Sequence, residues 1–243
     1  MTKFWLSQLD AVEYLKTLPD ASIDMVCTDV PYESLEKHRK VGTTTRLKHS
    51  KGSSNDWFDV FPNARFAELF AEFYRVLKRN AHCYFYCDWE TKFIAKPIGE
   101  AAGFKLRKPL VWHKKSIGMG YGYRAQHENI LYFEKGKRRL NDLGIGDVLE
   151  FPRIKGKDAY PTEKPVALNE VLVTQSTQPG EIVLDPFMGS GSAGVAAIKN
   201  GRCFLGNDID PKSFLHTRKR LLEIGGVESE PSITASISYG AGL

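Results

Sequence analysis

The sequence lacks several features that would assign it to a membrane, secreted or metal-binding class. The apolar runs in its 243 residues are too short to cross a membrane, and its beginning has no signal-peptide pattern. It contains no internal repeat. The spacing of its cysteines matches no zinc site, and they are Cys27, Cys83, Cys87 and Cys203. We therefore expect a cytoplasmic protein with buried free thiols, no metal and no membrane partner.

Acidic residues are absent from one stretch of an otherwise balanced chain. The net charge of +5 is modest, so it permits a nucleic-acid partner without requiring one. Residues 37–51 carry only cations, namely Lys37, Arg39, Lys40, Arg46, Lys48 and Lys51. A second basic cluster contains Lys137, Arg138 and Arg139. The two clusters are candidates for contacts with a DNA backbone, and a solvated loop is the alternative interpretation of the first.

The stretch 182–194 has the pattern of a strand, a glycine turn and a helix. The apolar run ends at Asp185. Gly189 and Gly191 follow in the turn, and small residues then begin a helix. About twenty residues later, a second short strand leads to Asp208. This combination predicts a nucleotide-type cofactor site, with an acidic side chain for a ribose diol. An ordinary turn of an α/β protein is the alternative.

A second polar sequence follows a buried strand near the beginning of the chain. Residues 23–28 form the predicted strand, and Asp29-Val30-Pro31-Tyr32 follows it directly. Open α/β sheets place their active sites at such strand ends. Residues 33–63 then show no periodic pattern of apolar residues. This segment is too long for a simple connection.

Strands and helices alternate over most of the chain, which predicts an α/β fold. We expect Asn63 to cap a helix over residues 63–77. We expect one domain over residues 1–224, with insertions at about 33–62 and 135–160, and a disordered tail over 225–243. The predicted strands cover residues 4–6, 23–28, 82–87, 104–112, 126–134, 148–151, 182–184 and 203–206, and the other predicted helices cover 10–18, 91–102, 166–175 and 211–223.

Two motifs carry a resemblance to a known family. Asp29-Val30-Pro31-Tyr32 resembles the Asp-Pro-Pro-Tyr motif of amino-group DNA methyltransferases. Asp185-Pro186-Phe187-Met188-Gly189-Ser190-Gly191 resembles their S-adenosylmethionine motif. The catalytic motif comes first, as in the circularly permuted beta class. The resemblance implies a Rossmann-like class I methyltransferase fold, with a mostly parallel sheet and helices on both faces.

The resemblance also implies roles for individual residues. Asp29 and the carbonyl of Val30 would accept from the target amine, with Pro31 in the same motif and Tyr32 stacking on the base. The family has proline where this chain has Val30, so preorganisation of the backbone is expected to be weaker. Asp208 would bind the ribose, Asp10 the adenine and Lys164 the methionine carboxylate, while Asp185 would bind the methionine ammonium or support the turn. The cofactor residues are thus Asp10, Lys164, Asp185, Pro186, Phe187, Gly189, Gly191 and Asp208.

The function implied is transfer of a methyl group to adenine N6 in double-stranded DNA, after base flipping. Cytosine-N4 methylation is the first alternative, because Asp29 favours adenine where serine would point to cytosine. A weakly active DNA-binding member of the fold and an RNA or protein amide methyltransferase are the others. The expected setting is the cytoplasm, in a bacterial or phage-encoded protein associated with the nucleoid through DNA. A homodimer and a separate restriction nuclease stay open.

Overall fold

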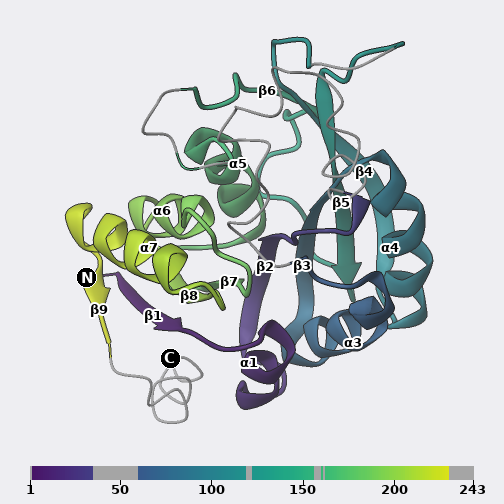
Figure 1. Ribbon diagram of the computed structural model, residues 1–243. Helices are drawn as coiled ribbons and strands as arrows, with labels where there is room; N and C mark the ends of the chain where they lie inside the picture. The colour runs from purple at the N-terminus through teal and green to yellow at the C-terminus, as the bar shows by residue number, and fades with distance from the viewer. Residues whose placement is uncertain (1, 35–59, 119–121, 156–159, 161, 230–243) are drawn as a thin grey trace.

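The computed structural model describes residues 2–34, 60–118, 122–155, 160 and 162–229. In these residues one sheet has the strand order β6-β4-β5-β3-β2-β7-β8-β1-β9. The first and last strands of the chain, β1 and β9, lie side by side (Figure 1). The strands are β1 (Lys3–Ser7), β2 (Ile23–Asp29), β3 (Leu77–Cys87), β4 (Lys105–His113), β5 (His127–Lys135), β6 (Val148–Glu150), β7 (Ile182–Asp185), β8 (Cys203–Asn207) and β9 (Val227–Glu228).

Helices cover both faces of the sheet. One face packs against α1 (Ala11–Thr17), α3 (Phe66–Val76) and α4 (Trp89–Ala101), and the other against α5 (Val166–Ser176), α6 (Ser192–Lys199) and α7 (Pro211–Glu223) (Figure 1). Successive residues of β2 point to opposite faces, so Val26 lies in one buried cluster and Met25 and Cys27 lie in the other. The Rossmann-like fold with helices on both faces is therefore confirmed. No helix in the described part of the chain is both long and apolar enough to cross a membrane.

The direction of the strands places the site. Among the described strands, β5 alone runs antiparallel to its neighbours, so the carboxyl ends of the others share one edge. The adjacent strands β2 and β7 continue into β3 and β8, which lie on opposite sides of them. Open α/β sheets bind ligands at such a topological switch point. We call this edge the site edge, and the other the opposite edge.

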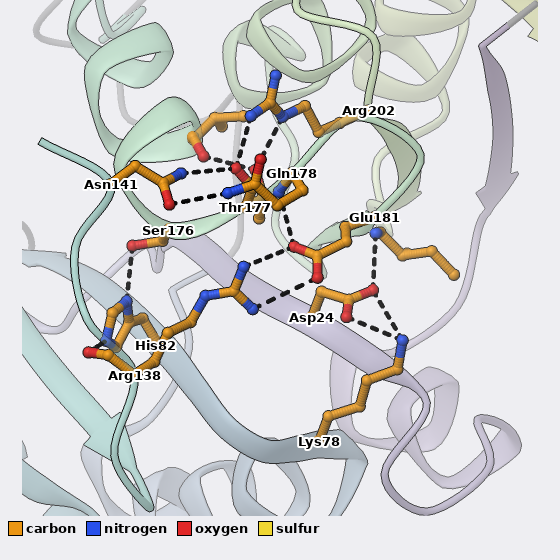
Figure 2. Close-up of polar contacts among 12 residues, drawn as sticks. Asp24, Lys78, His82, Arg138, Asn141, Ser176, Thr177, Gln178, Glu181 and Arg202 are labelled. Carbon is orange, nitrogen blue, oxygen red and sulfur yellow. Dashed lines mark hydrogen bonds and ion pairs between the residues drawn. The ribbon is translucent and has the colours of Figure 1, made fainter. Parts of the chain in front are cut away.

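The opposite edge is closed by paired charges, as Figure 2 shows. Arg138 binds Glu181 at 2.8 Å, and Lys78 binds the buried Asp24 at 2.8 Å. Arg202 donates to the backbone carbonyl of Thr177 at 2.6 Å. A buried charge is tolerated only when it is paired or hydrogen-bonded, so these contacts tie the connections on this side to the sheet.

Two expectations about the elements are wrong. Asn63 does not cap α3: it begins the 3-10 helix η1 (Asn63–Arg65), and its side-chain amide donates to Glu33 at 3.1 Å. The predicted boundary at residue 224 is too early, because Val227–Glu228 pairs with β1. A strand of two residues is too short to give a periodic signal. Residues 230–243 of the predicted tail lie outside the described residues.

The buried aromatic cluster against α3 yields a prediction about stability. Phe70 is fully buried and its ring contacts those of Phe66, Phe73, Phe85, Phe104 and Phe133. Phe70→Ala should lower the free energy of unfolding by about 3–5 kcal/mol, because it leaves a cavity. Phe93→Ala is the matched control, because Phe93 is 68% exposed. It should change the free energy of unfolding by less than about 0.5 kcal/mol. Urea unfolding measures both, and equal effects would contradict the assigned core.

Candidate functional site

A cavity of about 470 Å³ lies at the site edge, at the switch point between β2 and β7. Its volume is within the usual range for a small-molecule site. All four predicted catalytic residues line it, and so do the predicted cofactor residues apart from Gly191. Segments separated by more than 150 positions along the chain therefore meet here, as the sequence predicted. The predicted site residues that line the cavity are Asp10, Asp29, Val30, Pro31, Tyr32, Lys164, Asp185, Pro186, Phe187, Gly189 and Asp208.

The glycine turn between β7 and α6 is held by α7 and by the end of β8. Gly189 has φ +47°, and its N–H donates to Asp208 at 2.8 Å. Gly191 has φ +72°, and an added Cβ would lie 2.5 Å from Thr217 of α7. Both positions therefore favour glycine, but for different reasons. Gly189 borders the cavity, whereas Gly191 allows α7 to approach the turn, which the sequence did not distinguish.

Asp185 connects the two motifs. Its carboxylate accepts from the Thr28 hydroxyl at 2.8 Å and from the Phe187 N–H at 3.1 Å. Burial raises the pKa of Asp185 to about 7, although both hydrogen bonds act in the other direction. Asp29 and Asp208 add to the rise, because their negative charges disfavour a further one. Asp185 therefore supports the turn, and its charge changes near neutral pH.

The other two acidic residues predicted to bind the cofactor, Asp10 and Asp208, follow β1 and β8. Asp208 accepts from backbone N–H groups at positions 189 and 210, and burial raises its pKa. Asp10 caps α1 by accepting from the N–H groups of residues 12 and 13. Arg65 also binds Asp10 with two hydrogen bonds, of 2.7 and 2.9 Å, and so lowers its pKa. An ionised carboxylate thus borders the cavity at Asp10.

Aromatic rings form the wall between the two motifs. Phe187 packs edge-on against Phe61, with ring centroids 5.2 Å apart. The Phe61 N–H donates to the carbonyl of Pro31 at 2.7 Å. Tyr32 pairs with Phe61 in an isolated bridge and is only 7% exposed. Phe61 therefore holds residues 31 and 32 close to Phe187 of the glycine turn.

Lys164 lines the cavity, but carboxylates of the protein already engage its ammonium. Its ammonium forms an ion pair with Asp29 and lies 3.5 Å from Glu128. Burial acts to lower the pKa of Lys164, but the two carboxylates outweigh it and raise the pKa above its ordinary value. Burial raises the pKa of Asp29, and Lys164 opposes that rise. The expected contact of Lys164 with a methionine carboxylate would compete with these contacts.

Several site residues escaped the sequence analysis. Glu128 is the second residue of β5 and lies inside the predicted strand, where nothing marked it as a site residue. Arg65 follows the aperiodic segment, where no pattern indicated that it would reach Asp10. Asn207 donates to the carbonyls of Leu9 and Pro186, at 3.0 and 3.2 Å, and so joins two loops. An asparagine beside Asp208 gave no separate signal.

The predicted DNA contacts are not all brought to the site. The first basic cluster lies outside the described residues, and its members are Lys37, Arg39, Lys40, Arg46, Lys48 and Lys51. The cluster Lys137, Arg138 and Arg139 follows the carboxyl end of β5, which lies at the opposite edge because β5 is antiparallel. Arg138 is tied to Glu181 there. The direction of β5 therefore places this cluster away from the cavity, and its contact with DNA stays a prediction.

The chain resembles known proteins over most of its length. A family model described as DNA methylase matches residues 23–153 and 141–218. The putative methylase YubD of Escherichia coli K12 is 33% identical over 83% of this chain and 83% of its own length. The type II methyltransferase M.HpaI of Haemophilus parainfluenzae is 27% identical over 90% of this chain and 75% of its own length.

Solved structures show the same fold. The M1.HpyAVI–SAM complex matches with a TM-score of 0.66 and 24% identity, over 90% of this chain and 100% of that one. The PvuII DNA methyltransferase, described as cytosine-N4-specific, matches with a TM-score of 0.70 and 16% identity, over 98% of this chain and 92% of that one. At these identities the likeness establishes the fold.

The environment of Asp185 yields a prediction about pH. Its pKa is raised in the folded state, so the folded protein binds a proton that the unfolded chain has already released between about pH 4 and pH 7. The free energy of unfolding should therefore fall as the pH rises through this window. Asp185→Asn removes this titration but retains an oxygen for Thr28 and Phe187.

Urea unfolding from pH 4 to pH 8 should show that wild type loses stability relative to Asp185→Asn. The difference in the free energy of unfolding between the two proteins should change by up to about 1.4 kcal/mol per pH unit, which is roughly the maximum for one proton. Other groups titrate in both proteins, so the difference isolates Asp185. Parallel stability curves would show that Asp185 has an ordinary pKa.

Proposed function

Because the chain belongs to the S-adenosylmethionine-dependent N6/N4 amino-methyltransferases of the DNA methylase family, we propose that it methylates adenine N6 in double-stranded DNA. The observation that carries the proposal is the shared cavity. Asp29 ends β2 and the glycine turn follows β7, and both line the same space. A target amine bound at Asp29 is therefore placed beside a cofactor bound at the turn.

The cavity fits the chemistry of S-adenosylmethionine. The ligand has a ribose diol and two cationic groups, and the cavity presents carboxylates at Asp10, Asp185 and Asp208. A carboxylate accepts hydrogen bonds from hydroxyls and attracts cations. Phe187 adds an apolar surface, and Gly189 permits close approach of the backbone. The cofactor, when bound, supplies an electrophilic methyl group on its sulfonium.

Asp29 and Val30 act on the target amine. An exocyclic amine is a poor nucleophile, since its lone pair is delocalised into the ring. The Asp29 carboxylate and the Val30 carbonyl accept hydrogen bonds from the two N–H groups of the amine. These hydrogen bonds favour a pyramidal nitrogen with an available lone pair. Val30 packs in the buried core and also lines the cavity, and its backbone carbonyl is the group that we assign to the amine. Positioning of the amine carries the rate enhancement.

The base must leave the duplex before it can enter this cavity. Flipping costs a few kcal/mol, and stacking against Tyr32 would return roughly 1–3 kcal/mol of that. Aspartate at position 29, rather than serine, supports adenine over cytosine. The basic residues between 37 and 51 follow the tetrapeptide directly and are proposed to bind DNA phosphates. A cytoplasmic location, a homodimer and a separate nuclease partner belong to the same proposal.

The test is to incubate the protein with S-adenosylmethionine and mixed-sequence duplex DNA, and to identify the methylated nucleosides by mass spectrometry. N6-methyl-2′-deoxyadenosine supports the proposal. N4-methylcytosine would instead support the first alternative, which is methylation of cytosine N4. Methylation of RNA or protein alone would overturn a DNA substrate, and DNA binding without methylation would favour a binding role for the fold.

The role of Asp29 predicts a separation of catalysis from cofactor binding. Asp29→Ala should reduce the single-turnover rate by about 10²-fold or more, because the amine loses its acceptor. Binding of S-adenosylmethionine, measured by calorimetry, should change by less than about threefold, since the contact is with the base. Asp20→Ala is the control, because Asp20 is an exposed carboxylate paired with Arg75. A fully active Asp29→Ala protein would exclude the mechanism.

A further inference from the structure

Four charged side chains of alternating sign form a continuous chain that ends at the catalytic carboxylate. Asp29 ends β2 and pairs with Lys164, which precedes α5. Lys164 lies 3.5 Å from Glu128 at the start of β5, and Glu128 lies 2.5 Å from Lys114 after β4. We call Asp29, Lys164, Glu128 and Lys114 the charge chain. Its four members come from four separate segments, and its net charge is zero when all are ionised.

The surroundings leave Lys164 little freedom to move. Its side chain is 9% exposed, and its ammonium lies over the rings of Tyr86 and Trp112, at 5.5 and 5.9 Å from the centroids. Those rings are themselves fixed, because the Tyr86 hydroxyl donates to Asn169 and the Trp112 N–H donates to the carbonyl of Phe151. An ammonium between two carboxylates and two ring faces is strongly held.

We propose that Lys164 and Glu128 are positioning residues that keep Asp29 ionised and oriented for the target amine. This inference rests on the proposed methyl transfer to an amino group. It assigns Lys164 to the catalytic carboxylate rather than to the methionine carboxylate. Lys164 acts directly on Asp29, and Glu128 acts through Lys164.

The geometry explains the orientation. Lys164 binds Oδ2 of Asp29, and it is the one hydrogen-bond donor to this carboxylate within the described residues. Oδ1 therefore has no donor among the described residues, and we assign it to the amine. The Asp29 side chain is 28% exposed, on the side of the cavity. Without the Lys164 bond, the carboxylate could rotate about its last torsion, which is broad for aspartate.

The charge matters because only the ionised carboxylate is purely an acceptor. A protonated Asp29 would carry an O–H donor and lose acceptor capacity towards the amine. Burial raises the pKa of Asp29, whereas Lys164 and, more weakly, Lys114 lower it. Glu128 raises it, because its charge has the same sign. The two neighbours of Lys164 in the chain are therefore coupled through it.

Other titratable groups also face Asp29, and they set the background of the test. Asp185 lies on β7, Tyr86 and Cys87 on β3, and Cys27 on β2, while Tyr32 follows Asp29 in the tetrapeptide. Burial raises the pKa of each of these groups, so the thiols and phenols stay neutral at physiological pH. Asp185 is the one that titrates near neutrality, and it is unchanged in every variant below.

Substitutions at neighbouring links of the chain should act with opposite signs. Lys164→Met removes the cation, and Glu128 retains Lys114 as its partner, so the pKa of Asp29 should rise. Glu128→Gln removes a like charge and leaves Lys164 to Asp29 alone, so that pKa should fall. A merely structural role predicts loss of stability in both variants, without opposite shifts. Lys96→Met and Glu100→Gln are the matched controls, because these residues form an exposed pair at 2.7 Å on α4.

The first measurement does not depend on activity. Carbon-13 NMR of the aspartate carboxyls, with Asp29 assigned by its loss in Asp29→Asn, gives the Asp29 titration in each variant. The midpoint should rise by at least one pH unit in Lys164→Met and fall in Glu128→Gln, while the controls match wild type. Should Lys164→Met not fold, Lys114→Met replaces it, with a smaller rise. Coincident midpoints would overturn the inference.

The second measurement is the single-turnover rate from pH 5 to pH 9, at saturating S-adenosylmethionine. The acid limb should move to higher pH in Lys164→Met and to lower pH in Glu128→Gln, and a one-unit shift means a tenfold rate change below the midpoint. If Lys164→Met instead weakened cofactor binding tenfold and left the acid limb in place, Lys164 would belong to the methionine carboxylate. If wild type methylated no DNA, the proposed function would fail, and the NMR titration would still decide the charge chain.

Discussion

The site depends on one constraint, the adjacency of two parallel strands whose connections leave in opposite directions. β2 continues into β3 on one side and β7 continues into β8 on the other, so the carboxyl ends of β2 and β7 form a switch point in the strand order. The Thr28 hydroxyl bonds Asp185 across that point at 2.8 Å. A target amine and a cofactor can therefore meet there, because each motif follows one of the two strands.

The two edges of the sheet use charge in different ways. At the opposite edge, cations and carboxylates satisfy each other, as Arg138 does with Glu181. At the site edge, carboxylates border a cavity while still being held by neighbours. Asp10 is held by Arg65, and Asp29 is held by Lys164. Pairing with Arg65 lowers the pKa of Asp10, and pairing with Lys164 opposes the rise in pKa that burial causes at Asp29. Both carboxylates still have lone pairs for a ligand. The first edge stabilises the sheet, and the second provides acceptors.

The sequence predicted those parts of the site that follow parallel strands. Asp29, Asp185 and Asp208 each stand just after or at the end of a short apolar run, and the glycine turn marks the cofactor side. Parallel strands bring their carboxyl ends together, so three local signals were sufficient to predict one cavity. The fold followed from the same alternation of strands and helices. Contacts such as that between Arg65 and Asp10 were beyond reach, because they span an aperiodic segment whose path no local pattern specifies.

The direction of β5 decides where two charged parts of the chain lie relative to the site. Its apolar pattern predicts a strand equally well in either direction, since burial alternates identically. Running antiparallel, it brings Glu128, at its amino end, to the site edge and carries Arg138, beyond its carboxyl end, to the opposite edge. The antiparallel direction of this strand thus brings to the site an acidic residue that the motifs did not indicate, and it places the basic cluster at the opposite edge. A charged residue at the start of an apolar strand is therefore as informative as one at its end, once the direction of that strand is known.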